Sequence, residues 1–219
     1  MCLLLLDYRG PDWFLLAHRD ERPQRATAPV HFWEDLPILA GRDLEAGGTW
    51  LAFGCDGRWV ALTNGTPREA PDDSRSRGRL ALDFLSGSRS PWEFACSVQT
   101  QQYAGFHLWV ADLQQLVYRS NHHQPRVVES GTHVLGNAGL NSPGPREKRA
   151  RGLWDGAERT PSEWIASFQQ PELVIPGPGL FGFQTCTTVL AQRRQGRLEV
   201  WEQPLGQPLR GPFLIERQA

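Results

Sequence analysis

The sequence is poor in several features that would point to a function class. Lys148 is the only lysine among the 23 basic residues, which argues against a mechanism that forms a Schiff base on lysine. The formal net charge is −1, so nothing indicates nucleic acid or an anionic membrane as a partner. No stretch approaches the ~20 apolar residues that a membrane helix needs, and no membrane span is expected.

Cysteine is also scarce, and its spacing excludes further classes. The four cysteines are widely spread and form no CxxC pair, so neither a zinc site nor a thioredoxin-type motif is supported. The apolar run after Met1 is too short for a signal-peptide core, and no basic segment precedes it. The chain is therefore expected to be cytoplasmic and soluble, with free thiols and no bound metal.

The apolar runs that are present fall into strands and helices in separate blocks. Hairpins are expected in both halves of the chain, with Asp56-Gly57 as a strong turn signal between two of the strands. The expected strands are Leu3–Tyr8, Trp13–Ala17, Thr49–Gly54, Arg58–Thr63, Phe106–Ala111, Leu116–Arg119, Val127–Val128, His133–Leu135, Thr185–Gln192 and Arg197–Trp201. The expected helices are Arg79–Leu85, Pro91–Gln101, Pro145–Trp154 and Ser162–Gln170, and the expected loops are Asn64–Arg77 and Pro171–Gly182.

This order contains no alternation of strand, helix and strand, so a doubly wound parallel sheet is excluded. It suits an α+β fold with two antiparallel sheets, each covered by helices on its outer face. A length of 219 residues and the lack of an obvious linker predict one domain over residues 1–219. The Arg146–Arg151 cluster is expected on the solvated face of its helix.

The residue with the clearest chemical potential is Cys2. Removal of Met1 is favoured when the second residue is small, and it would leave a thiol and an α-amino group on one residue. The amine, with a pKa of about 7.7–8.0, could then act as a base toward the thiol, whose pKa is about 8.5. By itself, a cysteine at position 2 is more often an inert thiol.

Short motifs along the chain favour a catalytic role for Cys2 over an inert thiol. Six segments, found in the same order, resemble conserved segments of the NRDE family. They are Ala17-His18-Arg19-Asp20-Glu21, Gly47-Gly48-Thr49-Trp50-Leu51, Ala61-Leu62-Thr63-Asn64, Arg75-Ser76-Arg77-Gly78, Tyr103-Ala104-Gly105-Phe106 and Leu135-Gly136-Asn137-Ala138. The resemblance covers most of the chain, from Cys2 to Leu190.

The resemblance implies a fold and a set of roles. The family is similar to N-terminal-nucleophile (Ntn) hydrolases, which implies a four-layer αββα sandwich with Cys2 as the nucleophile. By the same resemblance, Arg19 and Asp20 would orient the Cys2 thiol and amine, and Asn64 and Asn137 would donate to an oxyanion. Two alternatives stay open: Arg19 and Asp20 would also suit a structural ion pair, and both asparagines would suit turns.

Three further residues are candidates for ligand binding. They are His18, Trp50 and Gln184, although a tryptophan on a strand would equally suit the core. His18 and His107 stand where the family has asparagine. Gln184 stands where the family usually has arginine, and the loss of that charge weakens the case for amidase chemistry.

Three functions follow from these observations. The first is a cysteine hydrolase, without a cofactor, that acts on an amide or thioester of an acyl-type small molecule. The second is a carrier of haem or an acyl lipid on the same fold, because the NRDE relatives are linked to haem trafficking and acyl-lipid homeostasis. The third is a structural or interaction protein, and a Cys2 thiol no more reactive than Cys96 would favour it.

Overall fold

The computed structural model describes residues 2–66, 74–177 and 182–216. Parts of the two expected loops, residues 67–73 and 178–181, lie outside the described residues. The described chain forms two compact units, one made of residues 2–24 with 130–216 and the other of residues 25–129. The second unit is thus inserted in the sequence between two halves of the first.

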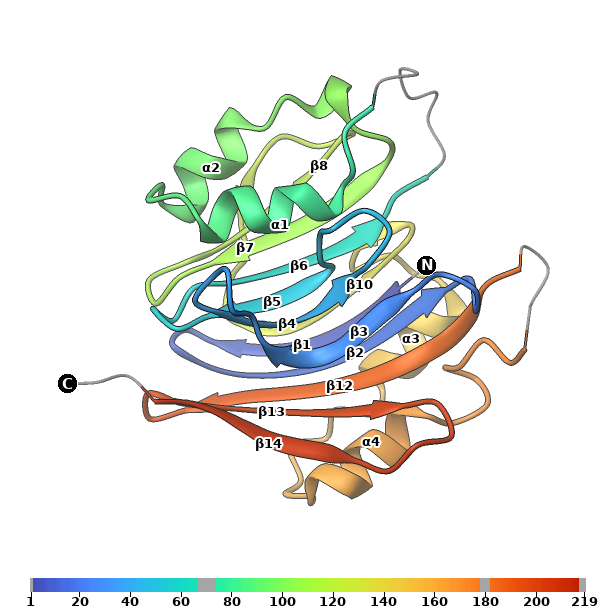
Figure 1. The fold of residues 1–219 in the computed structure, drawn as a ribbon. Coiled ribbons are helices and arrows are strands. Elements are labelled where there is room, and N and C mark those ends of the chain that lie inside the picture. The colour runs from blue at the N-terminus through green and yellow to red at the C-terminus, as the bar shows by residue number, and fades with distance from the viewer. Residues whose placement is uncertain (1, 67–73, 178–181, 217–219) are drawn as a thin grey trace. The chain divides into compact units, whose positions relative to one another are not determined.

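The first unit contains a seven-stranded antiparallel sheet in the order β11-β10-β1-β2-β12-β13-β14 (Figure 1). Its strands are β1 (Cys2–Arg9), β2 (Asp12–Glu21), β10 (Gly131–Gly136), β11 (Gly139–Leu140), β12 (Gln184–Arg194), β13 (Arg197–Pro204) and β14 (Arg210–Glu216). Two helices, α3 (Pro145–Arg151) and α4 (Pro161–Phe168), cover one face of this sheet.

Alternation along the strands explains why these helices dock there. Leu3, Leu5 and Leu16 point to the helix-covered face and pack against residues of α4 such as Ile165 and Phe168. Leu4 and Leu6 on the other face of β1 have no exposed surface. Because β1 is buried on both faces, its sequence reads as a continuous apolar run rather than an alternating one.

The second unit repeats this architecture with different strands. Its antiparallel sheet has the order β3-β4-β5-β6-β7-β8-β9, with α1 (Gly78–Leu85) and α2 (Pro91–Ser97) on one face (Figure 1). The strands are β3 (Thr27–Phe32), β4 (Ile38–Asp43), β5 (Leu51–Gly54), β6 (Trp59–Asn64), β7 (Phe106–Ala111), β8 (Leu116–Ser120) and β9 (Arg126–Val127), and a short 3-10 helix spans Thr100–Gln102. Phe84 of α1 and Phe94 of α2 pack together over the sheet, with ring centroids 5.2 Å apart.

The expected hairpins and helices are present, with two kinds of difference. The sequence analysis missed β3, β4, β11 and β14. Of these, β3 and β14 are edge strands that contain a proline and carry little apolar alternation. The helix expected over Pro91–Gln101 ends at Ser97, because Val98 adopts an extended backbone.

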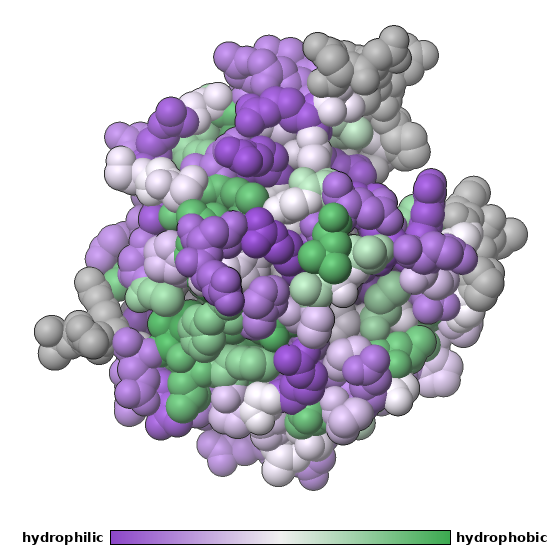
Figure 2. All heavy atoms as spheres, in the orientation of Figure 1, coloured by the Kyte–Doolittle hydropathy of each residue, from purple (hydrophilic) through white to green (hydrophobic). Residues whose placement is uncertain are grey.

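Hydrophobic residues remain on the surface at the β14 edge of the first unit. Figure 2 shows them gathered over β13 and β14 at the lower left. Leu214 of β14 and Leu205 in the preceding turn are among the exposed large hydrophobic residues. An exposed apolar edge strand can pair with another chain.

Candidate functional site

Cys2 is the first residue of β1, and the sheet of the first unit brings one of the expected site residues to it. Cys2 pairs with Arg19 of β2, and Arg19 pairs on its other side with Thr187 of β12. Cys2, Arg19 and Thr187 therefore form a row across three neighbouring strands. Asn137 lies at the same end of the sheet, in the turn between β10 and β11, so it has the turn position that was the alternative to a site role.

The Cys2 thiol is strongly influenced by its burial. Only 8% of the residue is exposed, and burial raises the pKa of the thiol, with the nearby Asp20 charge acting in the same direction. The Arg19 guanidinium and a hydrogen bond from the Asp20 main chain oppose this rise in pKa. The thiol therefore needs a base to become a nucleophile near neutral pH.

Arg19 places a cation on the same face of the sheet as Cys2. Its side chain is 7% exposed, and one of its guanidinium nitrogens lies 3.8 Å from a carboxylate oxygen of Glu21. Burial raises the pKa of the Cys186 thiol, and a hydrogen bond to Glu21 and the Arg19 charge offset part of that rise. A buried cation next to the row is available to orient an anionic or polarised group.

The Asp20 carboxylate lies on the opposite face of the sheet, where it is completely buried. Arg146 of α3 donates two hydrogen bonds to it, at 2.6 and 3.2 Å, and the Thr185 hydroxyl donates a third at 2.7 Å. The ion pairs of these two residues therefore include Arg19 with Glu21 and Asp20 with Arg146. Asp20 acts on the Cys2 thiol both through its charge, which raises the thiol pKa, and through a main-chain hydrogen bond, which lowers it.

Arg146 corrects one expectation and reveals a residue that the sequence analysis missed. Arg149 and Arg151 are exposed as expected, but Arg146 turns inward and also donates to the carbonyl of Leu173 at 2.7 Å. One signal was present in the sequence. Arg146 is in the first turn of its helix, where the helix dipole disfavours a cation, so a specific partner could have been expected.

His18 is fully buried on the helix-covered face of the first unit. Its Nε2 donates to the Phe168 carbonyl at 2.7 Å, and its Nδ1 lies 3.1 Å from the Thr188 hydroxyl. Because a carbonyl only accepts, the ring carries its proton on Nε2 and accepts at Nδ1. Burial lowers the pKa of His18 to about 4, so the ring is neutral at pH 7.

The remaining expected site residues have different surroundings. Gln184 begins β12, pairs with Glu21 and is partly exposed. Asn64 and Trp50 belong to the second unit: Asn64 ends β6 opposite Phe106, and the Trp50 carbonyl accepts from the Leu62 amide at 2.8 Å. The structure thus pairs Cys2 with Arg19 and places Asn137 in the β10–β11 turn of the same unit, whereas Asn64 and Trp50 belong to the other unit.

Several glycines in or next to the family-like motifs lie where two chain segments of the second unit approach each other closely. A Cβ at Gly48 would lie 2.6 Å from the Gly78 carbonyl carbon, so these two chain segments meet only without side chains. In the same way Gly65 donates to the Gly105 carbonyl at 2.8 Å, and Arg77 donates to that carbonyl at 3.0 Å. The motifs around these residues therefore join four distant segments of one unit.

Across residues 2–66, 74–177 and 182–216, no group of three His, Cys, Asp or Glu side chains is placed to hold a metal ion. Within those same ranges, no helix is long and apolar enough to cross a membrane. The four cysteines are free thiols.

Comparison with known proteins identifies relatives by sequence and by fold. The chain matches the model of the family "Transport and Golgi organisation 2", another name for the NRDE family, over residues 1–160. It is 37% identical over 143 residues to the Transport and Golgi organization 2 homolog of Mus musculus and 34% identical over 142 residues to that of Homo sapiens. Each alignment covers 59% of this chain and 51% of the relative, so the chain spans about half the length of these relatives.

Two solved structures share the fold at 10% sequence identity. One is the N-acylethanolamine-hydrolyzing acid amidase ortholog of Caenorhabditis elegans, with a TM-score of 0.54 over 86% of this chain and 91% of that one. The other is the C2A mutant of conjugated bile acid hydrolase from Clostridium perfringens, with a TM-score of 0.59 over 99% and 92%. The expected α+β, Ntn-hydrolase-like fold is confirmed. With a family match that covers well over half of its length, this chain belongs to the Transport and Golgi organisation 2 family.

Proposed function

We propose that this protein is an Ntn-type cysteine hydrolase that cleaves an amide or thioester of an acyl-type small molecule. The observation that carries the proposal is the pairing of Cys2 with Arg19 at one end of the sheet, with Asn137 in the β10–β11 turn at the same end. A thiol beside a cation, with an amide donor in a turn at the same sheet end, matches the needs of acyl transfer. The fold similarity to an N-acylethanolamine-hydrolyzing acid amidase and to a conjugated bile acid hydrolase supports this chemistry.

The mechanism begins with removal of Met1. The freed α-amine of Cys2 takes the proton from Sγ, and the thiolate attacks the substrate carbonyl carbon. The Asn137 amide donates to the resulting oxyanion. The bond to the leaving group then breaks, and the α-ammonium returns the proton to the leaving nitrogen or sulfur. Water, deprotonated by the amine, releases the acid from the Cys2 thioester.

The test is intact-mass and peptide mass spectrometry after incubation with a p-nitrophenyl acyl ester. We expect a chain without Met1 that carries one acyl group on Cys2. Cys2→Ala should abolish the adduct, whereas Cys96→Ala, which removes an exposed thiol in the other unit, should leave it unchanged. Asn137→Ala should slow acylation about a hundredfold if its amide stabilises the oxyanion. A purified protein that retains Met1 refutes this mechanism.

A second function, the non-catalytic carriage of haem or an acyl lipid, is favoured by different observations. Burial raises the pKa of the Cys2 thiol, the Asp20 carboxylate is bound by Arg146 and Thr185, and Gln184 brings no charge. Each of these reduces the power of the site to turn over a substrate. In a haem titration, a saturable Soret shift that is lost in Cys2→Ala, together with no acylation, would establish the carrier.

The cellular location is likewise a proposal. We infer a cytoplasmic protein from the four free thiols, because reducing compartments keep cysteines unpaired. Fractionation of cells that express the tagged protein tests this placement, and recovery with a membrane or secreted fraction would contradict it.

A further inference from the structure

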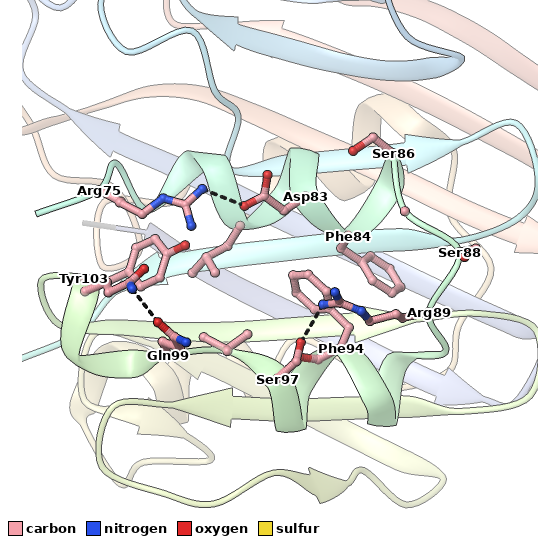
Figure 3. Close-up of a pocket in the computed structure, with 14 residues that line it drawn as sticks. Arg75, Asp83, Phe84, Ser86, Ser88, Arg89, Phe94, Ser97, Gln99 and Tyr103 are labelled. Atoms are coloured by element: carbon pink, nitrogen blue, oxygen red, sulfur yellow. Dashed lines mark hydrogen bonds and ion pairs between the residues drawn. The ribbon is translucent and has the colours of Figure 1, made fainter.

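A cavity of about 590 Å³ lies between α1 and α2 in the second unit (Figure 3). Its two phenylalanines, Phe84 and Phe94, belong to the packed core and are 1% and 5% exposed. Its arginines already have partners, because Arg75 pairs with Asp83 and Arg89 donates to a serine of α2. The cavity is therefore part of the packing of this unit. The contacts that bear on function lie in the first unit, at the end of β2.

The end of β2, where Asp20 lies, has little support from the neighbouring strands. β1 begins at Cys2, which pairs with Arg19, so Asp20 lies at the limit of the paired part of β1. On the other side, Asp20 pairs with Thr185 of β12, but the register shifts between Thr185 and Thr187. Such a shift locally disrupts the ladder of main-chain hydrogen bonds. The position of the Asp20 main chain therefore depends on other contacts.

The Asp20 side chain supplies those contacts on the helix-covered face. Arg146 of α3 donates two hydrogen bonds to the buried carboxylate, at 2.6 and 3.2 Å, and the Thr185 hydroxyl donates another at 2.7 Å. Both donors are themselves held by the segment after α4. Arg146 also donates to the Leu173 carbonyl at 2.7 Å, and the Thr185 hydroxyl accepts from the Ile175 amide at 2.8 Å. The carboxylate is thus tied to α3, to β12 and to that segment.

On the other side of the same residue, the Asp20 main chain forms a hydrogen bond to the Cys2 thiol. A main-chain N–H that donates to sulfur stabilises the thiolate, which is the nucleophilic form of cysteine. The strength of a hydrogen bond falls steeply when its length or angle changes. A small displacement of the end of β2 would therefore weaken the support that Asp20 gives to the Cys2 thiolate.

Charge acts on the thiol through the same residue. Burial raises the pKa of the Cys2 thiol first and the Asp20 charge raises it further, whereas the N-terminal amine, the Asp20 hydrogen bond and the Arg19 cation lower it. Because Arg146 carries the opposite charge beside the Asp20 carboxylate, it reduces the field of that carboxylate at the thiol. The other charged side chains in this region are Glu21 beside Arg19 and Glu147 of α3 beside Gly136.

From these contacts we propose that Arg146 is a positioning residue for the Cys2 site. By holding the Asp20 carboxylate on the helix-covered face, it fixes the end of β2 so that the Asp20 main-chain N–H is directed at Cys2 Sγ. Arg146 acts through Asp20 rather than on a substrate. This role rests on the proposed function, because it concerns the activation of the same thiol.

The test is the pH dependence of Cys2 alkylation by iodoacetamide in the full chain, followed by peptide mass spectrometry. Because the thiolate is the reacting form, Arg146→Gln should move the profile about one unit to higher pH and slow alkylation at pH 7 about tenfold. Arg146→Lys keeps the cation beside Asp20 and should recover most of the rate.

Two controls accompany these variants. Arg149→Gln removes an exposed arginine from the same helix and should leave the Cys2 profile unchanged. The exposed thiol of Cys96, in the other unit, is the internal reference and should react equally in every variant.

A purely structural role for Arg146 would lower stability but leave the Cys2 profile of the folded variant where it is in the wild type, and that result would overturn the proposal. An equal shift in Arg149→Gln would overturn it as well. If Arg146→Gln does not fold, Thr185→Val decides, since it removes only a neutral donor to Asp20. We then expect alkylation at pH 7 to slow about threefold, and an unchanged profile would refute the role.

The alkylation profiles also separate this role from the proposed hydrolase, because they report on the thiol without turnover. A wild type that is alkylated at Cys2 but never acylated by the ester contradicts the hydrolase alone. A wild type that is acylated, with a profile that Arg146→Gln does not move, contradicts the positioning role alone.

Discussion

Arg146→Gln is the substitution for which the structure makes the most definite stability prediction. It removes the cation that donates two hydrogen bonds to Asp20, a carboxylate with no exposed surface. The Thr185 hydroxyl remains as a neutral partner. A buried charge that loses its ionic partner typically costs 3–5 kcal/mol of the free energy of unfolding. Because Arg146 is 22% exposed and Thr185 stays in place, we expect the lower end, about 3 kcal/mol.

Urea unfolding followed by circular dichroism measures this loss directly. In thermal unfolding of the same variant, a loss of about 3 kcal/mol corresponds to a fall in Tm of about 6–12 °C for a chain of this length. Arg149→Gln, an exposed arginine on the same helix whose partner is the Gln170 side chain, should cost less than about 0.5 kcal/mol. The double variant Asp20→Asn with Arg146→Gln should recover part of the stability, because it buries no charge.

Either of two results would contradict the predicted loss of stability. One is a cost for Arg146→Gln no greater than that for Arg149→Gln. The other is a double variant that is no more stable than Arg146→Gln alone. Either result would mean that the Asp20 carboxylate is not held as a buried anion.

Three further predictions concern stability. The folded-state pKa of His18 is about 4, below its unfolded value of about 6.5, so the unfolded state binds the extra proton. Acidification from pH 7 to pH 4 should therefore lower the free energy of unfolding of the wild type by about 3 kcal/mol more than that of His18→Asn. Equal pH dependence of the two proteins in urea titrations would contradict this. Gly48→Ala should lower stability by about 3 kcal/mol or greatly reduce soluble yield, because its Cβ meets the main chain of Gly78, whereas Gly152→Ala should be nearly neutral; similar Tm values for both would refute the close approach. Thr160→Ala should cost about 1 kcal/mol through loss of the α4 capping box, and an unchanged urea midpoint would show that the cap does not contribute.

Local signals in the sequence determined most of the secondary structure. The Asp56-Gly57 turn between apolar runs predicted the β5–β6 hairpin, and Thr160, Pro161 and Glu163 predicted the start of α4. These signals work because turns and caps depend on the conformational preferences of adjacent residues. Edge strands such as β3 escaped prediction because a strand exposed on one side needs no apolar alternation.

The grouping of Cys2 with Arg19 was also expected from the sequence, through the motifs that resemble the NRDE family. The register of β1 with β2 and β10 was not, and it sets the turn that carries Asn137 at the same end of the sheet. Pairing between strands more than a hundred residues apart depends on the whole sheet rather than on local preference.

What the sequence alone determined is therefore the fold class and most of the helices and hairpins, because these follow from local pattern and short motifs; it also singled out Cys2 as the candidate nucleophile. Only the tertiary structure decided on which face of the sheet each polar side chain lies. Adjacent residues on a strand point to opposite faces, so Arg19 lies with Cys2 while Asp20 turns away to Arg146, a partner 126 residues distant in the chain. The α1–α2 cavity, too, exists only once two short helices have packed over one sheet.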